Sequence, residues 1–431
     1  MNGNKNPQKV RLILIGAGGR GTIYARLSLL MAHKGQVVAV AEPRDFFRDR
    51  IAKICNIPAE NCFPDWHEVL LREKFADAVV ITTQDQMHVE PSVAFARKGY
   101  HILLEKPLAP DAESCRRIVE TVHQNNVMLS LCHVMRYATY TKLLRDMIRD
   151  GAIGKIISVQ LLEPVGHWRF AHSYVRGNWN REEKSSSILM AKSIHDLDWI
   201  CFIMGQKCTK LSSFGALTYF HKGNRPADAA DRCLDCPREE ACPYSARRFY
   251  LERFRENRID NYIESVVDPL TEENILDALR SGPYGRCVFA CDNDVVDHQV
   301  VNMEFEDKST AVFTLAGCSL YDERRATIFG SEGEIRCDGS RIRIFSYRNN
   351  TVNEIPIAPD QGTLTTHHNG GDLYCLEAFV DAVASGDERK ILTGPEESLH
   401  SYNMVFAAEI SRKTGTVVSP DALHAASVIP G

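Results

Sequence analysis

The sequence predicts an α/β fold: an N-terminal doubly wound parallel sheet, then a C-terminal α+β domain with a large, mostly antiparallel, open-faced sheet. Over the first 132 residues, short apolar runs alternate with helical patterns. The runs are apolar throughout, which is typical of parallel strands that helices cover on both faces. Between residues 295 and 357, β-rich segments follow one another with turn signals such as Asp338-Gly339 between them, which indicates a second sheet.

The elements of the first half are expected to alternate strictly between strand and helix. Each expected strand is a short aliphatic run, and the runs lie at 10–15, 36–41, 78–82, 100–104 and 127–131. The helical patterns between them lie at about 22–34, 45–55, 86–98 and 111–125. We therefore expect an N-terminal domain over residues 1–133.

The pattern changes after Cys132. The elements expected next are a helix at 139–150, a strand at 155–162, a helix at 195–204 and, near the end, helices at 372–385 and 396–413. The organisation predicted from this is an α+β domain over 134–420, a cysteine-rich insertion at about 221–294, and a loose tail at 421–431.

Composition excludes several classes of protein. The 431 residues carry 51 basic and 56 acidic side chains, a formal net charge of −5, so no broad attraction for nucleic acid is expected. The longest early apolar run, Val10 to Ile15, is too short to cross a membrane. With no signal peptide and no membrane segment in the pattern, we expect a cytoplasmic protein.

A glycine-rich motif lies between the first expected strand and the first expected helix. Residues 16–21 read Gly-Ala-Gly-Gly-Arg-Gly and match G-x-G-x-x-G. The first glycine permits a tight turn, the second lets the main chain approach a pyrophosphate, and the third lets helix pack on strand. A pyrophosphate would then rest on free N–H groups at the helix N-terminus. The motif predicts a dinucleotide-binding Rossmann domain.

An acidic residue completes this signature. Glu42 stands 21 residues after Gly21, at the end of the second expected strand, where a carboxylate accepts a hydrogen bond from a ribose 2′-hydroxyl. A carboxylate there repels a 2′-phosphate, so NAD is favoured over NADP. Arg44, two residues further on, would partly offset that repulsion.

Four more motifs follow expected strands or open expected helices. They are the turn Thr82-Thr83-Gln84-Asp85-Gln86-Met87-His88, the triplet Glu105-Lys106-Pro107, the segment Ile194-His195-Asp196-Leu197-Asp198 and the loop His368-Asn369-Gly370-Gly371-Asp372. Together with the glycine motif, they make the sequence resemble the Gfo/Idh/MocA family, named after glucose–fructose oxidoreductase and inositol dehydrogenase. The resemblance covers nearly the whole chain.

The resemblance implies an NAD-dependent oxidoreductase that transfers a hydride between the nicotinamide and a hydroxyl carbon of a sugar, sugar acid or cyclitol. Lys106 would stabilise the developing alkoxide, and His195 would act as general acid/base at the same hydroxyl. The cofactor is expected to contact Gly16, Ala17, Gly18, Gly19, Arg20, Gly21, Glu42, Thr82, Thr83, His88, Glu105 and Lys106.

One position departs from the family pattern. Many sugar and cyclitol dehydrogenases of the family carry an aspartate four residues before the histidine, where this chain has Ala191, followed by Lys192. The partner of Lys192 is expected to be an anionic group of the substrate or Asp196, one helical turn along. Asp198 would share a helical face with His195 and orient it.

The substrate wall is expected to come from two segments. His133, Arg136 and Tyr137 follow the strand that ends at Leu131, and residues 167–179 form a loop dense in aromatic and hydrogen-bonding side chains. The loop could instead be a packing segment or a subunit contact. The residues expected to bind substrate are Lys106, Arg136, His172, Arg176, Trp179, Lys192 and His195.

Five of the 14 cysteines cluster in the insertion. Cys233-x2-Cys236-x5-Cys242 is followed by Cys287 and Cys291, and this spacing suits tetrahedral coordination of a structural zinc ion. Cys287 is the preferred fourth ligand. Buried reduced thiols, redox-labile thiols or an iron–sulfur cluster are the alternatives.

Two other functions remain open at this point. A sugar epimerase or glycosidase-like enzyme would use the same residues but retain and recycle its NAD. A non-catalytic sensor of NAD or sugar would bind without turnover. In each reading the partner is a small sugar-like molecule, and by resemblance the chain is expected to form a homodimer or homotetramer.

Overall fold

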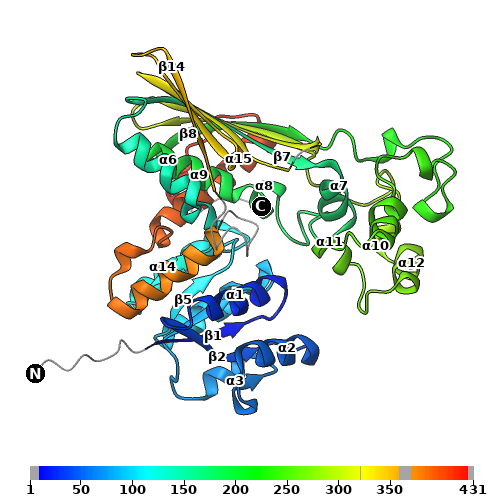
Figure 1. Cartoon of the computed structure of the whole chain (residues 1–431), viewed down its shortest axis with the longest axis horizontal. Helices are drawn as coiled ribbons and strands as arrows, with labels where there is room; N and C mark the ends of the chain where they lie inside the picture. The colour runs from blue at the N-terminus through cyan, green and yellow to red at the C-terminus, as the bar shows by residue number, and fades with distance from the viewer. Residues whose placement is uncertain (1–8, 321, 359–369, 426–431) are drawn as a thin grey trace, which may run out of the picture.

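The computed structural model describes residues 9–320, 322–358 and 370–425. The chain forms two sheets with their helices, and a lobe of short helices extends to one side of the second sheet (Figure 1). Within the described ranges, no helix is long and apolar enough to cross a membrane. The expected tail is described only as far as residue 425.

The first sheet is wholly parallel, as predicted. Its order is β3-β2-β1-β4-β5-β6, with strands β1 (Val10–Ile15), β2 (Gly35–Ala41), β3 (Cys62–Phe63), β4 (Ala78–Ile81), β5 (His101–Leu104) and β6 (Leu129–Leu131). The helices are α1 (Gly19–Leu30), α2 (Asp45–Cys55), α3 (Trp66–Leu71), α4 (Val89–Arg97) and α5 (Ala112–Gln124). The short elements β3 and α3 were not foreseen. Strand order reverses between β1 and β4, which is where dinucleotides bind in such sheets.

The second sheet has the order β14-β13-β12-β11-β7-β10-β9-β8, and only β7 and β10 pair in parallel. Its strands are β7 (Ile156–Gly166), β8 (Cys208–Ala216), β9 (His298–Phe305), β10 (Thr310–Ser319), β11 (Arg325–Gly330), β12 (Gly333–Cys337), β13 (Arg341–Ser346) and β14 (Thr351–Pro356). Along β10, buried residues alternate with partly exposed ones. One face is therefore covered and the other open, which confirms the predicted fold class.

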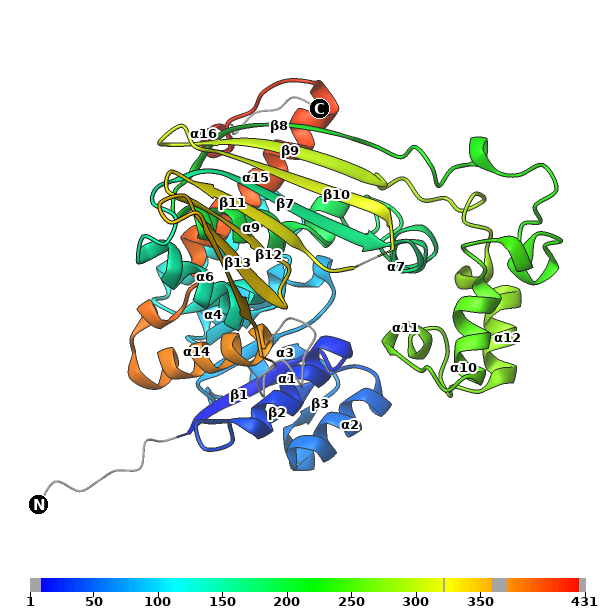
Figure 2. The same cartoon turned by 45° about the horizontal axis from the view of Figure 1, so that its top comes forward.

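Helices cover one face of this sheet. They are α6 (Thr139–Arg149), α9 (Ile194–Met204) and α15 (Pro395–Thr414), and Figure 2 shows the sheet lying over them. At the end of β7 the chain turns into α7 (His167–Phe170) and a π-helical turn, η4 (Ala171–Arg176), while α8 (Ile188–Ala191) precedes α9. Residues 167–195 therefore form one edge of the second domain.

The insertion between β8 and β9 forms the lobe. Its helical segments include η8 (Arg247–Glu252), α10 (Arg253–Arg255), α11 (Asn261–Glu264) and α12 (Glu272–Ser281). The lobe has a small core of its own, made of Cys233, Ala246, Tyr250, Leu251, Ile263, Ile275 and Leu279.

Helix α14 (Gly371–Ser385) crosses back to the first sheet although it lies late in the chain. Leu376, Phe379 and Val380 belong to the same buried cluster as Leu12 of β1 and Val37 of β2. The parallel sheet is thus covered in part by a segment that follows the second sheet in sequence.

Candidate active site

The glycine loop has the geometry that the motif predicts. Gly16 has a φ of +91°, and a Cβ added there would lie 2.8 Å from the carbonyl oxygen of Thr82. A Cβ on Gly21 would lie 2.2 Å from the carbonyl oxygen of Gly16, because helix α1 packs directly on the loop. Gly18 and Gly19, by contrast, face open space at the start of α1. The loop therefore leaves room for a pyrophosphate at the helix N-terminus.

Glu42 lies buried at the end of β2, beside this loop. It accepts hydrogen bonds from the Ala17 N–H at 2.9 Å and from the Arg44 Nε at 2.7 Å. Burial alone would raise the pKa of Glu42, but these bonds outweigh burial and hold the pKa below its ordinary value. The lowered pKa favours the ionised carboxylate, and its contact with the ribose of a dinucleotide stays a prediction.

Arg20 connects the glycine loop to both halves of the chain. Its Nε donates to Glu105 at 2.5 Å and its Nη2 to Asp372 of α14 at 2.5 Å. Glu105 also accepts from the hydroxyl of Tyr24 at 3.1 Å and from the main-chain N–H of Lys106 at 3.1 Å. Of the expected family loop, Asp372 is therefore in the site region, whereas His368 and Asn369 lie outside the described residues.

The turn after β4 contacts both the glycine loop and the loop that follows Lys106. The Thr82 hydroxyl donates to the Gly16 carbonyl at 2.8 Å, and the Thr83 hydroxyl donates to the Met87 carbonyl at 3.0 Å. The buried His88 ring lies 2.6 Å from the Pro107 carbonyl and 3.2 Å from the Thr83 carbonyl. These contacts fix the two loops relative to each other, and direct contact with a cofactor stays a prediction for all three side chains.

Lys106 follows β5 and reaches towards the second domain. Its Nζ donates to the main-chain carbonyl of Ala191 at 2.7 Å. Burial lowers the pKa of Lys106, and the nearby charges of Asp85 and Glu105 only partly oppose that effect. A lysine in such surroundings gives up its proton more readily than a solvated one.

His195 begins the buried turn of α9 and is 5% exposed. Its ring meets the ring of His133 edge to face, with centroids 5.8 Å apart. His133 is wholly buried, and burial lowers its pKa to about 4, with the charge of Lys106 acting in the same direction. The structure therefore brings the predicted catalytic histidine and lysine into one cluster around His133.

Lys192 pairs with a side chain that the sequence did not suggest, and not with Asp196, while its contact with an anionic group of the substrate stays a prediction. Its Nζ forms an ion pair with Glu163 of β7 at 2.5 Å. Asp196 instead pairs with Arg324 at 2.5 Å, and Arg324 also reaches Glu163 at 2.8 Å. Sequence reasoning missed Glu163, although a carboxylate within the apolar run Leu161–Val165 is the signal that would have found it.

Burial shifts the pKa values in this charge cluster. It lowers the pKa of Lys192 to about 8, although Glu163 opposes the shift. It also raises the pKa of Asp196, with Arg324 opposing. The carboxylates of Glu163 and Asp196 thus pair with the cations of Lys192 and Arg324 in a buried network that begins at the residue after Ala191.

Arg136 is buried and held by Asp198. Its Nε and Nη2 donate to the two carboxylate oxygens at 2.8 and 2.7 Å, and Ser401 donates to the same carboxylate at 2.8 Å. His133 Nε2 lies 4.0 Å from Asp198. The predicted roles of Arg136 in substrate binding and of Asp198 in orienting His195 stay predictions.

The three residues chosen from the 167–179 loop lie in different surroundings. His172 stacks on Tyr284, with ring centroids 4.7 Å apart, and bonds the Tyr250 hydroxyl at 2.7 Å. Arg176 is buried and faces the insertion, while Trp179 is partly exposed. His172 and Arg176 thus bind the lobe to the second domain, and their contact with substrate stays a prediction.

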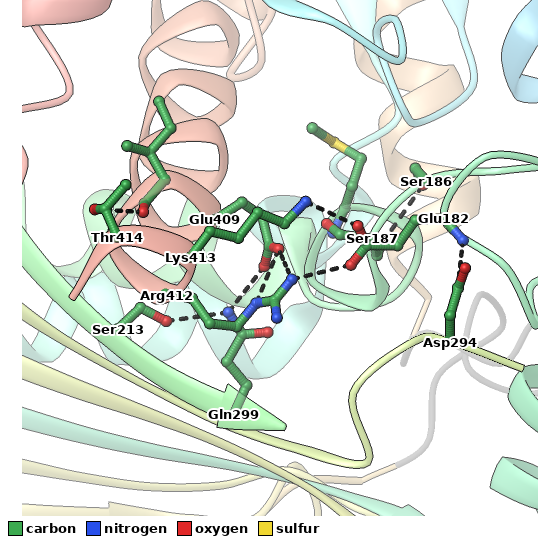
Figure 3. Close-up of polar contacts among 12 residues, drawn as sticks. Glu182, Ser186, Ser187, Ser213, Asp294, Gln299, Glu409, Arg412, Lys413 and Thr414 are labelled. Carbon is green, nitrogen blue, oxygen red and sulfur yellow. Dashed lines mark hydrogen bonds and ion pairs between the residues drawn. The ribbon is translucent and has the colours of Figure 1, made fainter. Parts of the chain in front are cut away.

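The segment that leads into Ala191 is fastened to helix α15. Figure 3 shows Arg412 between Glu409 of the same helix and Glu182 of the loop, at 2.6 and 3.0 Å. Lys413 contacts the other oxygen of Glu182 at 2.9 Å. The main-chain N–H of Glu182 also donates to Asp294 at 2.8 Å. This network holds the loop around Glu182, which leads along the chain to Ala191, against helix α15.

The predicted zinc ligands surround a single cavity but form no recognisable metal site. Cys233, Cys236, Cys242 and Cys287 all line a cavity of about 190 Å³ in the insertion. Over the part of the chain that the structure describes, no three His, Cys, Asp or Glu side chains are arranged to hold a metal ion. The structure lends no support to structural zinc.

Comparison with known protein families covers both halves of the chain. Residues 10–133 match the Gfo/Idh/MocA family described as "Oxidoreductase family, NAD-binding Rossmann fold". Residues 145–419 match its companion, "Oxidoreductase family, C-terminal alpha/beta domain".

Individual relatives are similar over different lengths. "Putative oxidoreductase YteT" of Bacillus subtilis is 23% identical over 379 residues, which is 84% of this chain and 85% of that protein. Myo-inositol 2-dehydrogenase of Thermotoga maritima is 26% identical over 211 residues, 48% of this chain and 59% of the relative. A solved levoglucosan dehydrogenase in complex with NADH and levoglucosan has the same fold, with a TM-score of 0.71 at 16% identity. The match covers 96% of this chain and 99% of that one.

Proposed function

The chain belongs to the Gfo/Idh/MocA family of oxidoreductases, and on that premise we propose that it is an NAD-dependent dehydrogenase of a sugar, sugar acid or cyclitol. The observation that carries the proposal is the position of Lys106. Its half-buried side chain follows β5, at the same end of the sheet as the glycine loop, and its amine donates to the carbonyl of Ala191 in the second domain. Sugar and cyclitol dehydrogenases among the relatives support the substrate class.

The residues at the dinucleotide site fit the cofactor. Gly18 and Gly19 leave open space at the N-terminus of α1, and Glu42 is ionised where a ribose would lie. When bound there, the nicotinamide would supply the acceptor or donor for a hydride. Arg20, held by Glu105 and Asp372, would keep the loop and the second domain in register around it.

The proton chemistry is assigned to Lys106 and His195. As hydride leaves the substrate carbon, the hydroxyl proton must leave its oxygen, so a base near neutral pKa is needed beside that oxygen. Burial lowers the pKa of Lys106 towards this range. His195 would take the proton, and Lys106 would donate a hydrogen bond to the alkoxide oxygen as negative charge develops on it.

Cofactor choice follows from Glu42 and Arg44. The carboxylate favours two ribose hydroxyls, so NAD is the preferred cofactor, while the Arg44 side chain, paired with Glu42 but 58% exposed, would have to turn away from Glu42 to meet a 2′-phosphate. We therefore expect measurable but weaker use of NADP.

A screen of sugars, sugar acids and cyclitols, followed at the NADH absorbance band with each dinucleotide, tests the proposed function. Reduction of NAD by one compound class, lost in Lys106→Ala, supports it. Substrate conversion without net NADH would instead indicate a retained cofactor, and binding of NAD without conversion of any compound would indicate a sensor.

The open face of the second sheet is proposed as the subunit interface. Ile157 of β7 and Phe214 of β8 expose 51% and 64% of their surface on their strands. Contiguous apolar patches mark contact surfaces, and we propose that these two side chains belong to one. Light scattering after gel filtration should therefore show an oligomer, and Phe214→Lys should shift it towards monomer.

A further inference from the structure

A second cavity lies between the segment 167–176 and the insertion, with a volume of about 510 Å³. Its walls are formed by His167, Trp168, Ala171 and Arg176 on one side and by Pro243, Tyr244, Ser245, Arg248, Phe249, Arg253 and Arg258 on the other. Four of these residues are arginines, and no carboxylate is among the described residues that line the cavity. This is an unusual composition for a structural void, because like charges facing one another are unfavourable.

Two of the four arginines have only neutral partners. Arg176 is 4% exposed and donates to the carbonyl oxygens of Arg286 and Tyr244, both at 2.8 Å. Its third contact is the thiol sulfur of Cys233 at 3.4 Å. Arg248 donates to the Glu240 carbonyl. Among the described residues, no carboxylate lies within ion-pair distance of either guanidinium. Arg248 is exposed, whereas Arg176 is buried, so the positive charge of Arg176 is the buried one that is left for an anion to balance.

The other two arginines are compensated and hold the aromatic wall in place. Arg253 pairs with Asp260 at 2.7 Å and lies 4.9 Å from the ring centroid of Phe249. Phe249 stacks on Trp168 at 5.2 Å with an interplanar angle of 24°. Arg258 pairs with Glu256. Aromatic side chains suit the apolar C–H face of a sugar ring, and guanidinium groups that have no ion-pair partner, such as those of Arg176 and Arg248, suit a carboxylate or sulfate.

The cavity shares a segment with the catalytic edge. Arg169, next to Trp168, pairs with Asp322. Besides burial, which is the larger cause, its positive charge lowers the pKa of Lys106 and of Lys192. Within the segment 167–176, Arg169 is therefore close enough for its charge to act on both lysines, while its neighbour Trp168 lines the cavity.

We propose that this cavity is a binding site for an anionic saccharide, with the carboxylate or sulfate held by Arg176 and Arg248 and the ring held against Trp168 and Phe249. The site is separate from the dinucleotide site. Its occupation needs neither NAD nor turnover, so the inference stands apart from the proposed redox function.

Calorimetric titration of the full chain without dinucleotide tests the proposal. The probes are glucuronate, glucose 6-sulfate, neutral glucose and inorganic sulfate, at low ionic strength. We expect glucuronate or glucose 6-sulfate to bind at least about tenfold more tightly than glucose and than inorganic sulfate, the difference expected for one charge-assisted hydrogen bond. Which of the two acids binds more tightly identifies the anionic group.

Two variants make the test specific. Arg248→Ala should weaken binding of the preferred acid by about tenfold, whereas Arg247→Ala, an exposed neighbour that does not line the cavity, should leave it unchanged. Ligand should also change the tryptophan emission, and Trp168→Phe should remove that change. Equal affinity for glucose and both acids, equal affinity for inorganic sulfate, unchanged binding by Arg248→Ala, or no binding of either acid would each overturn the proposal. Dehydrogenase assays on the same samples report separately on the redox function.

Discussion

The amine of Lys106 donates to the main-chain carbonyl of Ala191 across the boundary between the two domains, at 2.7 Å. Ala191 stands where, by family resemblance, many sugar and cyclitol dehydrogenases carry an aspartate. In this chain a neutral carbonyl holds the lysine, and Glu163 and Asp196 are paired with Lys192 and Arg324. Burial lowers the pKa of Lys106, and the charges of Asp85 and Glu105 only partly oppose that effect.

Replacing Lys106 by alanine should lower kcat by about 10³-fold, because the hydrogen bond to the developing alkoxide is lost. The dinucleotide contacts come from the glycine loop and Glu42, so the dissociation constant for NADH should change less than threefold. Stopped-flow absorbance gives the first quantity and a fluorescence titration the second. Unchanged kcat would remove Lys106 from the mechanism.

Replacing Ala191 by aspartate should raise the pKa of Lys106, because a carboxylate would stand beside the amine in a buried site. Because Lys106 is assigned the hydrogen-bond donor, the alkaline limb of the kcat/KM profile, where the ammonium loses its proton, should move to higher pH. Ala191→Asn is the matched control, since it adds similar volume without charge. An alkaline limb that does not move in Ala191→Asp would argue against Lys106 as the charged donor.

Replacing Glu42 by glutamine should raise the preference for NADP relative to NAD by roughly tenfold or more, because the repulsion of a 2′-phosphate is removed while Arg44 remains. Arg44→Ala should have the opposite effect. The ratio of kcat/KM values for the two dinucleotides is the measurement. Parallel loss with both cofactors would mean that Glu42 only supports the glycine loop through Ala17.

Acid should destabilise the protein through His172. Burial lowers the pKa of its ring from 6.5 to about 4, so the folded chain holds the neutral form while the unfolded chain takes up a proton near pH 6.5. Unfolding is therefore favoured as pH falls below 6.5, by about 2 kcal/mol between pH 7 and 5. His172→Gln cannot titrate and should lose that part of the pH dependence in urea melts. An unchanged slope would contradict the buried neutral ring.

Replacing Arg412 by alanine should lower the free energy of unfolding by about 1–3 kcal/mol, because two partly buried carboxylates, Glu182 and Glu409, lose their partner. The loop leading to Ala191 should also be cut faster in limited proteolysis. Lys413→Ala is the control: that side chain is 57% exposed, and the loss should stay below about 1 kcal/mol. Equal effects of the two substitutions would argue against a special role for Arg412.

Much of the fold could be read from short-range pattern. The apolar runs at 10–15 and 78–82 and the glycine motif between strand and helix predict the parallel sheet, because its strands are buried on both faces. The two-residue strand β3 could not be found this way, since so short a strand carries no periodicity. Helix α14 was predicted to within one residue of its bounds, but its packing against the first sheet was not predicted, because sequence order does not reveal which core a helix joins.

The candidate site likewise has residues that could be predicted from the sequence and contacts that could not. Gly16, Glu42 and Lys106 were predictable because each stands at the end of a strand in a parallel sheet. The pairing of Lys192 with Glu163 was not predictable, because the two residues lie on separate elements and the pair depends on how β7 packs relative to the end of α8. The cysteine spacing predicted a shared location but not a coordination geometry, since spacing constrains proximity without fixing the direction of each thiol.

Helix α14 also sets the order of events during synthesis. The apolar side of the first sheet that receives Phe379 and Val380 is translated more than two hundred residues before them and stays uncovered until then. A ribosome-bound or truncated N-terminal half would present that surface to chaperones and to other nascent chains. Expression of residues 1–133 alone should therefore yield aggregates, whereas joining residues 370–386 to that fragment through a linker should recover part of its solubility.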